Sequence, residues 1–180
     1  MPAVIAAVAT VGLLCLVDLL LTFGVIRRLR EHTELLRSQP VRAERPVISL
    51  TTGQAPELFT LVTSGGTVVT GPGGLRLAGF FSSSCSACPE RVAPFIAYAR
   101  TNRLASDEVL AVLLVGDGDE PPLYANDLAR VARVSVQPFD CLVTKAFGVT
   151  GYPAFCLLDA DGAVVSSGFD PAALPAPAMA

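Results

Sequence analysis

The chain has 180 residues, of which 52% are hydrophobic, and a formal net charge of -3. This charge excludes the basic surface of a nucleic-acid-binding protein, which neutralises phosphates with clustered Lys and Arg. Five cysteines are too few for a small secreted domain held together by disulfides. The length suits one domain with an appendage, and the mean hydropathy of +0.55 indicates a membrane segment beside a well-filled α/β core.

The N-terminal segment predicts a transmembrane helix. Residues 3–26 form a largely apolar run with one charge, Asp18, and a helix of this length crosses a hydrocarbon core of about 30 Å. A cleaved signal peptide is the alternative, but it needs a basic region before the apolar run, and none is present. We therefore expect a retained anchor and stalk helix over residues 1–37 and a linker over residues 38–48.

Small and polar residues share one face of this predicted helix. They are Gly12, Cys15, Asp18 and Thr22. Such a stripe favours close association with another helix in lipid. Alternatively, Asp18 is simply protonated within a long apolar helix, and both interpretations remain open.

The remainder of the chain predicts one domain over residues 49–169, with an Ala- and Pro-rich, disordered tail over residues 170–180. We expect strands at 58–62, 67–69, 75–81, 109–115, 134–136, 154–158 and 163–166, and helices at 85–103, 122–132 and 139–147. The last two strands flank Asp159-Ala160-Asp161-Gly162, a strong hairpin turn. Alternating strands and helices that end in a hairpin predict a three-layer α/β domain with a mixed central sheet.

The motif Cys85-Ser86-Ala87-Cys88 follows a predicted buried strand and opens a predicted helix. Unpaired N–H groups at a helix N-terminus favour the thiolate of the first cysteine, which is the reactive form. The second thiol, one turn later, can attack a mixed disulfide and release the product. The alternatives are half of a zinc site, which lacks two further ligands, and two buried cysteines without a redox role.

A second signal is the segment Gly151-Tyr152-Pro153-Ala154-Phe155. Proline is tolerated at the first residue of a strand, where no ladder N–H is needed. A cis bond before Pro153 would form a tight turn that exposes backbone to a bound peptide.

Together these motifs resemble the thioredoxin superfamily. Residues 53–61 are similar to the entry strand of its TlpA/ResA-type and redoxin branches, and residues 147–155 are similar to their cis-proline segment. The apolar anchor and the Arg-rich stalk resemble MauD-like members. The resemblance covers about residues 49–168.

The resemblance implies a nucleophilic Cys85, a resolving Cys88, and substrate contacts at Tyr152 and at a cis Pro153. The chain departs from the family at three positions. Ser84 stands where the family has Trp, Ala87 where it has Pro, and Gly79 where thioredoxin has a buried acid. The departures leave the fold expectation unchanged, whereas the redox potential, the direction of exchange and the partner stay open.

The sequence thus predicts a membrane-anchored thiol:disulfide oxidoreductase that acts on protein thiols or disulfides. Its redox group is the Cys85–Cys88 pair, without a metal or other cofactor, and a membrane-embedded redox donor or acceptor is compatible with the tether. A peroxiredoxin-like enzyme is disfavoured because residues 78–84 contain neither Pro nor Thr. A non-catalytic maturation or binding module of the same fold is the third hypothesis. For Cys141 and Cys156 we favour structural roles.

The two signals for membrane topology disagree. Arg27, Arg28, Arg30 and Arg37 follow the apolar segment, and the positive-inside rule then assigns the domain to the cytoplasm. The family resemblance implies an extracytoplasmic domain, which we favour because a tether suits thiol chemistry on exported proteins.

Overall fold

The computed structural model of the chain describes residues 12, 15–16 and 47–177. The chain divides into two compact units, Met1–Glu44 and Arg45–Ala180. In the first unit the described residues Gly12, Cys15 and Leu16 are helical and exposed. Most of the predicted anchor, including Asp18 and Thr22, lies outside the described residues. Among those described, no helix has the length and apolar character needed to span a membrane.

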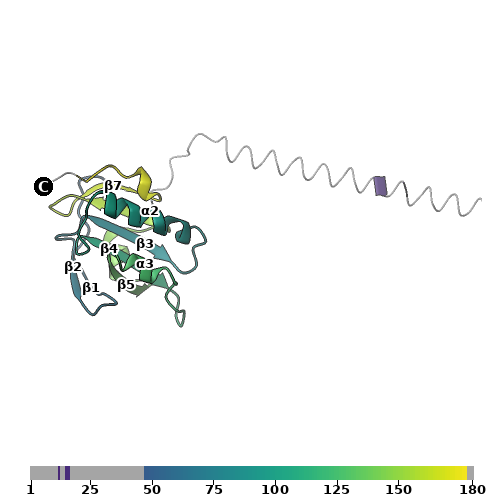
Figure 1. The fold of residues 1–180 in the computed structure, drawn as a ribbon, viewed down its shortest axis with the longest axis horizontal. Helices are drawn as coiled ribbons and strands as arrows, with labels where there is room; N and C mark the ends of the chain where they lie inside the picture. Colours follow the sequence, from purple (N-terminus) through teal and green to yellow (C-terminus); the bar gives the residue numbers. More distant parts are fainter. Residues whose placement is uncertain (1–11, 13–14, 17–46, 178–180) are drawn as a thin grey trace, which may run out of the picture. The chain divides into compact units, whose positions relative to one another are not determined.

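The second unit is built on a five-stranded mixed sheet with the order β5-β4-β3-β6-β7 (Figure 1). Its strands are β3 (Leu77–Ser82), β4 (Val109–Val115), β5 (Arg133–Pro138), β6 (Ala154–Leu158) and β7 (Val164–Gly168). Strands β3, β4 and β5 are parallel, whereas β6 is antiparallel to both β3 and β7. A separate antiparallel hairpin pairs β1 (Phe59–Val62) with β2 (Val68–Gly71). The predicted mixed sheet is confirmed.

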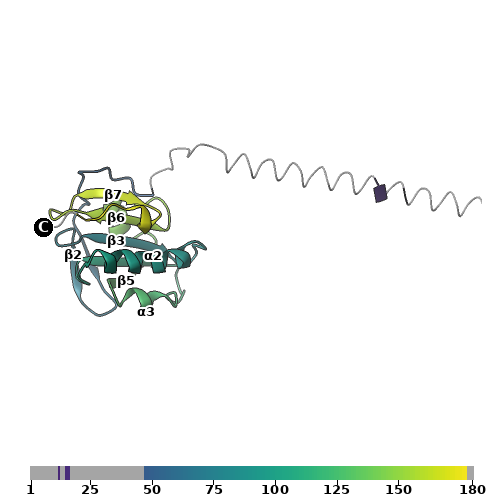
Figure 2. The ribbon, with the colours of Figure 1, turned by 45° about the horizontal axis from the view of Figure 1, so that its top comes forward.

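Two apolar layers cover the sheet. The helical elements are α2 (Cys88–Thr101), α3 (Ala125–Leu128), α4 (Leu142–Phe147) and the 3₁₀ turn η1 (Pro171–Ala173). Helices α2 and α3 pack on one face, and α4 and the β1–β2 hairpin pack on the other. Helix α2 runs alongside β3 (Figures 1 and 2). The molecule therefore has the predicted three layers, with β3 at the centre.

Strand β3 is buried along its whole length. Because side chains alternate between the faces of a sheet, Leu77 and Phe81 pack with α2, and Ala78 and Phe80 pack with α4. A strand buried on both faces reads as a continuous apolar run. The cysteine motif follows directly after the carboxyl end of this strand.

Helix α2 begins at Cys88, and not at Cys85 as the sequence analysis expected. Proline has no N–H group, so Pro89 cannot donate to the Cys85 carbonyl four residues earlier. That carbonyl accepts from the Cys88 N–H instead, at 3.2 Å. Proline is well tolerated in the first turn of a helix, which is where Pro89 lies.

The helix expected over residues 122–132 is also shorter than predicted. Only Ala125–Leu128 is α-helical, and turns flank it on both sides. Leu128 and Val131 are buried as expected, but Leu123 is 96% exposed. Because the helix starts late, Leu123 precedes it and the helical spacing does not apply to that residue.

The boundaries of the domain lie further out than expected. Ile48, assigned to the linker, is fully buried and forms a β-bridge with Val149. The prediction of a disordered tail is wrong for residues 170–177. There Leu174 is buried against the α2 side of the core, and Asp170 pairs with Arg91 at 3.3 Å. The tail is thus attached to the domain by the buried Pro171 and Leu174, by the ion pair of Asp170, and by a hydrogen bond from the Tyr98 hydroxyl to the Pro175 carbonyl.

Candidate active site

The cysteine motif occupies two consecutive turns between β3 and α2. The Cys85 N–H donates to the Ser82 carbonyl at 3.2 Å, and the Cys88 N–H donates to the Cys85 carbonyl at 3.2 Å. The Ser82 hydroxyl accepts from the Ser84 N–H at 3.2 Å. These bonds fix the path of the chain from the end of the sheet to the first turn of the helix.

The two thiols of the motif differ in accessibility. Both are free, and Cys85 is partly exposed whereas Cys88 is 0% exposed. Burial, followed by a hydrogen bond to the Cys85 side chain, raises the pKa of the Cys88 thiol to about 12. The Ser82 N–H opposes this shift by donating to Cys88 Sγ at 3.4 Å. The arrangement can present one thiol to a partner and keep the other protonated in reserve.

Gly79 marks the position where the family resemblance implies a buried acid. A Cβ atom built on Gly79 lies 2.7 Å from Phe95 Cε2 and 3.1 Å from Phe81 Cε2. Both rings are fully buried and meet edge to face, with centroids 5.6 Å apart. The space of the missing carboxylate is therefore filled by aromatic rings.

The segment before β6 reaches the same edge of the sheet. The antiparallel register pairs Phe80 with Ala154, so Pro153 lies beside the carboxyl end of β3. The Tyr152–Pro153 peptide bond is cis, as the resemblance implies. Burial, with smaller contributions from the charges of Cys141 and Cys88, raises the pKa of Tyr152. The structure thus brings the predicted substrate-binding residues together with the cysteine motif.

Tyr124 is a site residue that the sequence analysis missed. It caps the N-terminus of α3, and its ring lies 6.0 Å from that of Phe81. Burial, and then the charges of Cys88 and Cys85, raise the pKa of Tyr124 to about 12. Within the sequence Tyr124 lies in an expected helix, and no local pattern distinguishes it. Its proximity to the cysteines arises only from the packing of α3 against α2.

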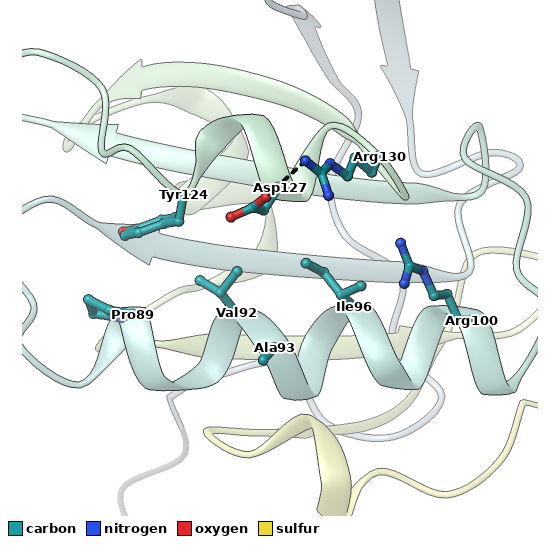
Figure 3. Close-up of a pocket in the computed structure, with 8 residues that line it drawn as sticks. All are labelled: Pro89, Val92, Ala93, Ile96, Arg100, Tyr124, Asp127 and Arg130. Atoms are coloured by element: carbon teal, nitrogen blue, oxygen red, sulfur yellow. Dashed lines mark ion pairs between the residues drawn. The ribbon is translucent and has the colours of Figure 1, made fainter.

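A pocket of about 330 Å³ lies between α2 and α3, beside the cysteine motif (Figure 3). Pro89 and Tyr124 line the end nearest Cys88, and the Tyr124 ring points along the pocket toward Pro89. At the other end, Arg130 pairs with Asp127 at 3.6 Å on an exposed surface. Tyr124 is therefore a partly buried residue in the wall of this pocket.

The other two cysteines of the domain are buried. Cys156 is fully buried in β6, and burial raises its pKa to about 12. Cys141 caps α4, with its Sγ 3.5 Å from Thr144 Oγ1. Within the described ranges, no group of three or more His, Cys, Asp or Glu residues is arranged to hold a metal ion.

No family model and no curated protein sequence matches the chain, but solved structures do. A thiol:disulfide interchange protein from Bacteroides sp. superposes with a TM-score of 0.52 at 18% identity, over 69% of this chain and 86% of its own. A thiol-disulfide oxidoreductase from Bacteroides fragilis gives 0.49 at 15% identity, over 63% and 89%. A thio-disulfide isomerase from Thermus thermophilus gives 0.47 at 17%, over 67% and 87%. The first of these shows that the chain has the thioredoxin-like fold its sequence predicts.

Proposed function

We propose that this chain is a thiol:disulfide oxidoreductase that exchanges disulfides with protein substrates through Cys85 and Cys88. The observation that carries the proposal is the pairing of a partly exposed thiol with a fully buried one, hydrogen-bonded to each other at the carboxyl end of β3. Exchange needs one thiol that a partner can reach and a second that attacks only the mixed disulfide.

The exchange proceeds in two steps. In the first, the Cys85 thiolate attacks a substrate disulfide, forming a mixed disulfide and expelling one substrate thiolate, which takes up a proton. In the second, Cys88 loses its proton and attacks Cys85 Sγ, expelling the other substrate thiolate, which is also protonated. The substrate disulfide gains two electrons, and the protein forms a Cys85–Cys88 disulfide. The reverse sequence oxidises a substrate dithiol.

Tyr152 and Pro153 are proposed to contact the substrate beside Cys85. Their position at the edge of β6 nearest the motif supports this assignment. The apolar segment 3–26 supports a membrane tether for the domain. A tethered enzyme would meet exported proteins or a membrane-embedded redox partner.

The test is to trap the mixed disulfide with Cys88→Ser. Without the resolving thiol, the first step still runs and the second cannot. We expect Cys88→Ser to form a stable adduct with a disulfide-containing protein such as insulin, joined through Cys85 and released by dithiothreitol. Peptide mapping by mass spectrometry identifies the linked cysteine.

The double variant Cys85→Ser/Cys88→Ser is the control and is expected to form no such adduct. An adduct of Cys88→Ser that runs through Cys141 or Cys156, or the absence of any adduct, contradicts the proposal. The absence of any adduct favours the non-catalytic binding module, which holds a partner without a covalent bond.

A further inference from the structure

The hydroxyl of Tyr124 is buried and unused. Its oxygen is buried, and no hydrogen-bond partner for it exists among the described residues. Buried polar groups are nearly always paired, because a donor that loses its hydration without gaining a partner destabilises the fold. An unpaired phenol next to a candidate active site therefore points to a partner that forms during the reaction.

The surroundings of the Tyr124 hydroxyl point to Cys88 as this partner. Tyr124, Cys85 and Cys88 all pack in the apolar cluster between the sheet and α2. The ring is held against Phe81, and it points toward the end of α2 where Cys88 begins the helix (Figure 3). The two cysteines are also the charged groups that act on the Tyr124 phenol.

The second step of the proposed exchange needs a hydrogen-bond donor for the Cys88 thiolate. Cys88 is fully buried, and its thiolate must form in a poorly solvated place before it attacks. At the family's position for a buried acid, Gly79 and the Phe95 ring leave no room for a carboxylate. The Ser82 N–H already donates to Cys88 Sγ at 3.4 Å, and one neutral donor compensates only part of the lost hydration of an anion.

We propose that Tyr124 is a catalytic residue whose hydroxyl donates a hydrogen bond to the Cys88 thiolate during the resolving step. The proposal rests on the exchange function proposed above and names a residue that supports it. In the dithiol form the buried Cys88 thiol keeps its proton, and the Tyr124 hydroxyl has no partner among the described residues. When Cys88 loses its proton to solvent, the Tyr124 side chain shifts so that its hydroxyl donates to the new negative charge and keeps its own proton. Cys88 Sγ then attacks Cys85 Sγ, and the substrate sulfur leaves with the electron pair of the broken bond.

Other titratable groups surround this pair on every packed element. Cys85 before α2 and Tyr152 before β6 are the near ones, whereas Arg100 on α2, Asp127 on α3 and Arg130 after it line the pocket further from Pro89. Asp127 and Arg130 form an exposed ion pair, and such a pair contributes little beyond its own neighbourhood. Of the polar groups on α2 and α3 that line the pocket, only the Tyr124 phenol has its pKa raised by the charges of both cysteines.

The experiment compares Tyr124→Phe with the unchanged chain, using dithiobis(nitrobenzoate) as the disulfide. Attack by Cys85 forms a thionitrobenzoate adduct on that residue, and attack by Cys88 removes it. Acid quenching and mass spectrometry follow the adduct on the Cys85 peptide through both steps. We expect Tyr124→Phe to leave formation of the adduct unchanged and to slow its removal about tenfold, the value of one charge-assisted hydrogen bond.

The dependence on pH identifies the Cys88 thiolate as the group that removes the adduct. Because burial is the largest cause that raises the pKa of the Cys88 thiol, and Cys88 has no charge partner on Cys85 in the adduct, removal of the adduct should accelerate with each pH increment from about pH 6 to pH 9 in both proteins. The phenol of Tyr124, with a pKa of about 12, stays protonated throughout this range. The tenfold gap between the two proteins is therefore expected to persist at every pH.

Tyr98→Phe is the matched control, because the Tyr98 hydroxyl donates to the Pro175 carbonyl at the tail and not to the dithiol. It should leave both steps unchanged. Equal removal rates for Tyr124→Phe and the unchanged chain overturn the proposal, and so does an equal slowing of both steps. If the unchanged chain forms the adduct but never removes it, the exchange function itself fails, which distinguishes the two outcomes.

Discussion

Replacing Cys85 with serine is expected to reduce insulin disulfide reduction to the rate of dithiothreitol alone. A serine hydroxyl does not ionise near neutral pH and does not attack disulfides, so the first step of exchange is lost. Cys88 cannot substitute, because it is 0% exposed and its pKa is about 12. Turbidity of the released insulin chains measures the rate.

Cys15→Ser is the control for this prediction. Cys15 is the other cysteine with an exposed side chain, but it lies in the first unit of the chain and outside the candidate site. We expect this variant to keep the activity of the unchanged chain. Loss of activity in Cys15→Ser, with activity retained in Cys85→Ser, would show that Cys85 is not the attacking thiol.

The substitution Gly79→Ala is expected to lower the free energy of unfolding by about 1–3 kcal/mol, which is typical of overpacking in a close-packed core. The new methyl group would lie 2.7 Å from Phe95 Cε2 and 3.0 Å from Phe95 Cζ. The Phe95 ring cannot move away freely, because it packs against Phe81 and Phe155 with centroids 5.6 Å from each. Urea denaturation followed by circular dichroism measures the loss.

Gly168→Ala is the matched substitution within the same sheet. A Cβ atom on Gly168 meets no atom within 4 Å, so we expect a change of no more than about 0.5 kcal/mol. If both alanine variants unfold at the same urea concentration, Phe95 does not fill the space beside Gly79. The structural reason given for the missing acid would then be wrong.

The strands that the sequence predicts best are the ones buried on both faces. Residues 109–115 and 154–158 are predicted with the observed boundaries, β4 and β6, because an unbroken apolar run is itself the pattern of a buried strand. Their apolar character does not depend on which neighbour they contact. Sequence therefore predicts these two strands residue by residue, whereas β3, expected at 75–81, is observed at Leu77–Ser82.

Helix boundaries near prolines are predicted less well. The start of α2 depends on a hydrogen bond that Pro89 cannot donate, and this shifts the helix past Cys85. The length of α3 depends on turns after two consecutive prolines, Pro121 and Pro122. Proline shifts a helix boundary because it lacks a backbone N–H group, whereas hydrophobic periodicity depends on side chains alone.

The candidate site divides in the same way. Cys85, Cys88 and Pro153 can be found from sequence because each belongs to a short motif. Tyr124 cannot, because its proximity to the cysteines depends on the packing of α3 against α2. The ring of Phe95 beside Gly79 is likewise a tertiary fact, although the glycine itself signals that the usual acid is missing.

Whether Cys85 and Cys88 form a redox couple can be measured by a redox titration of the full chain in glutathione buffers, read by mass spectrometry of the cysteine peptides. We expect a reversible disulfide between Cys85 and Cys88, formed in a single two-electron transition with a slope of about 30 mV per tenfold change in ratio. Cys85→Ser should show no such transition. A chain in which Cys85 and Cys88 stay unlinked at every ratio, or in which Cys85 pairs with Cys141 or Cys156, contradicts the account.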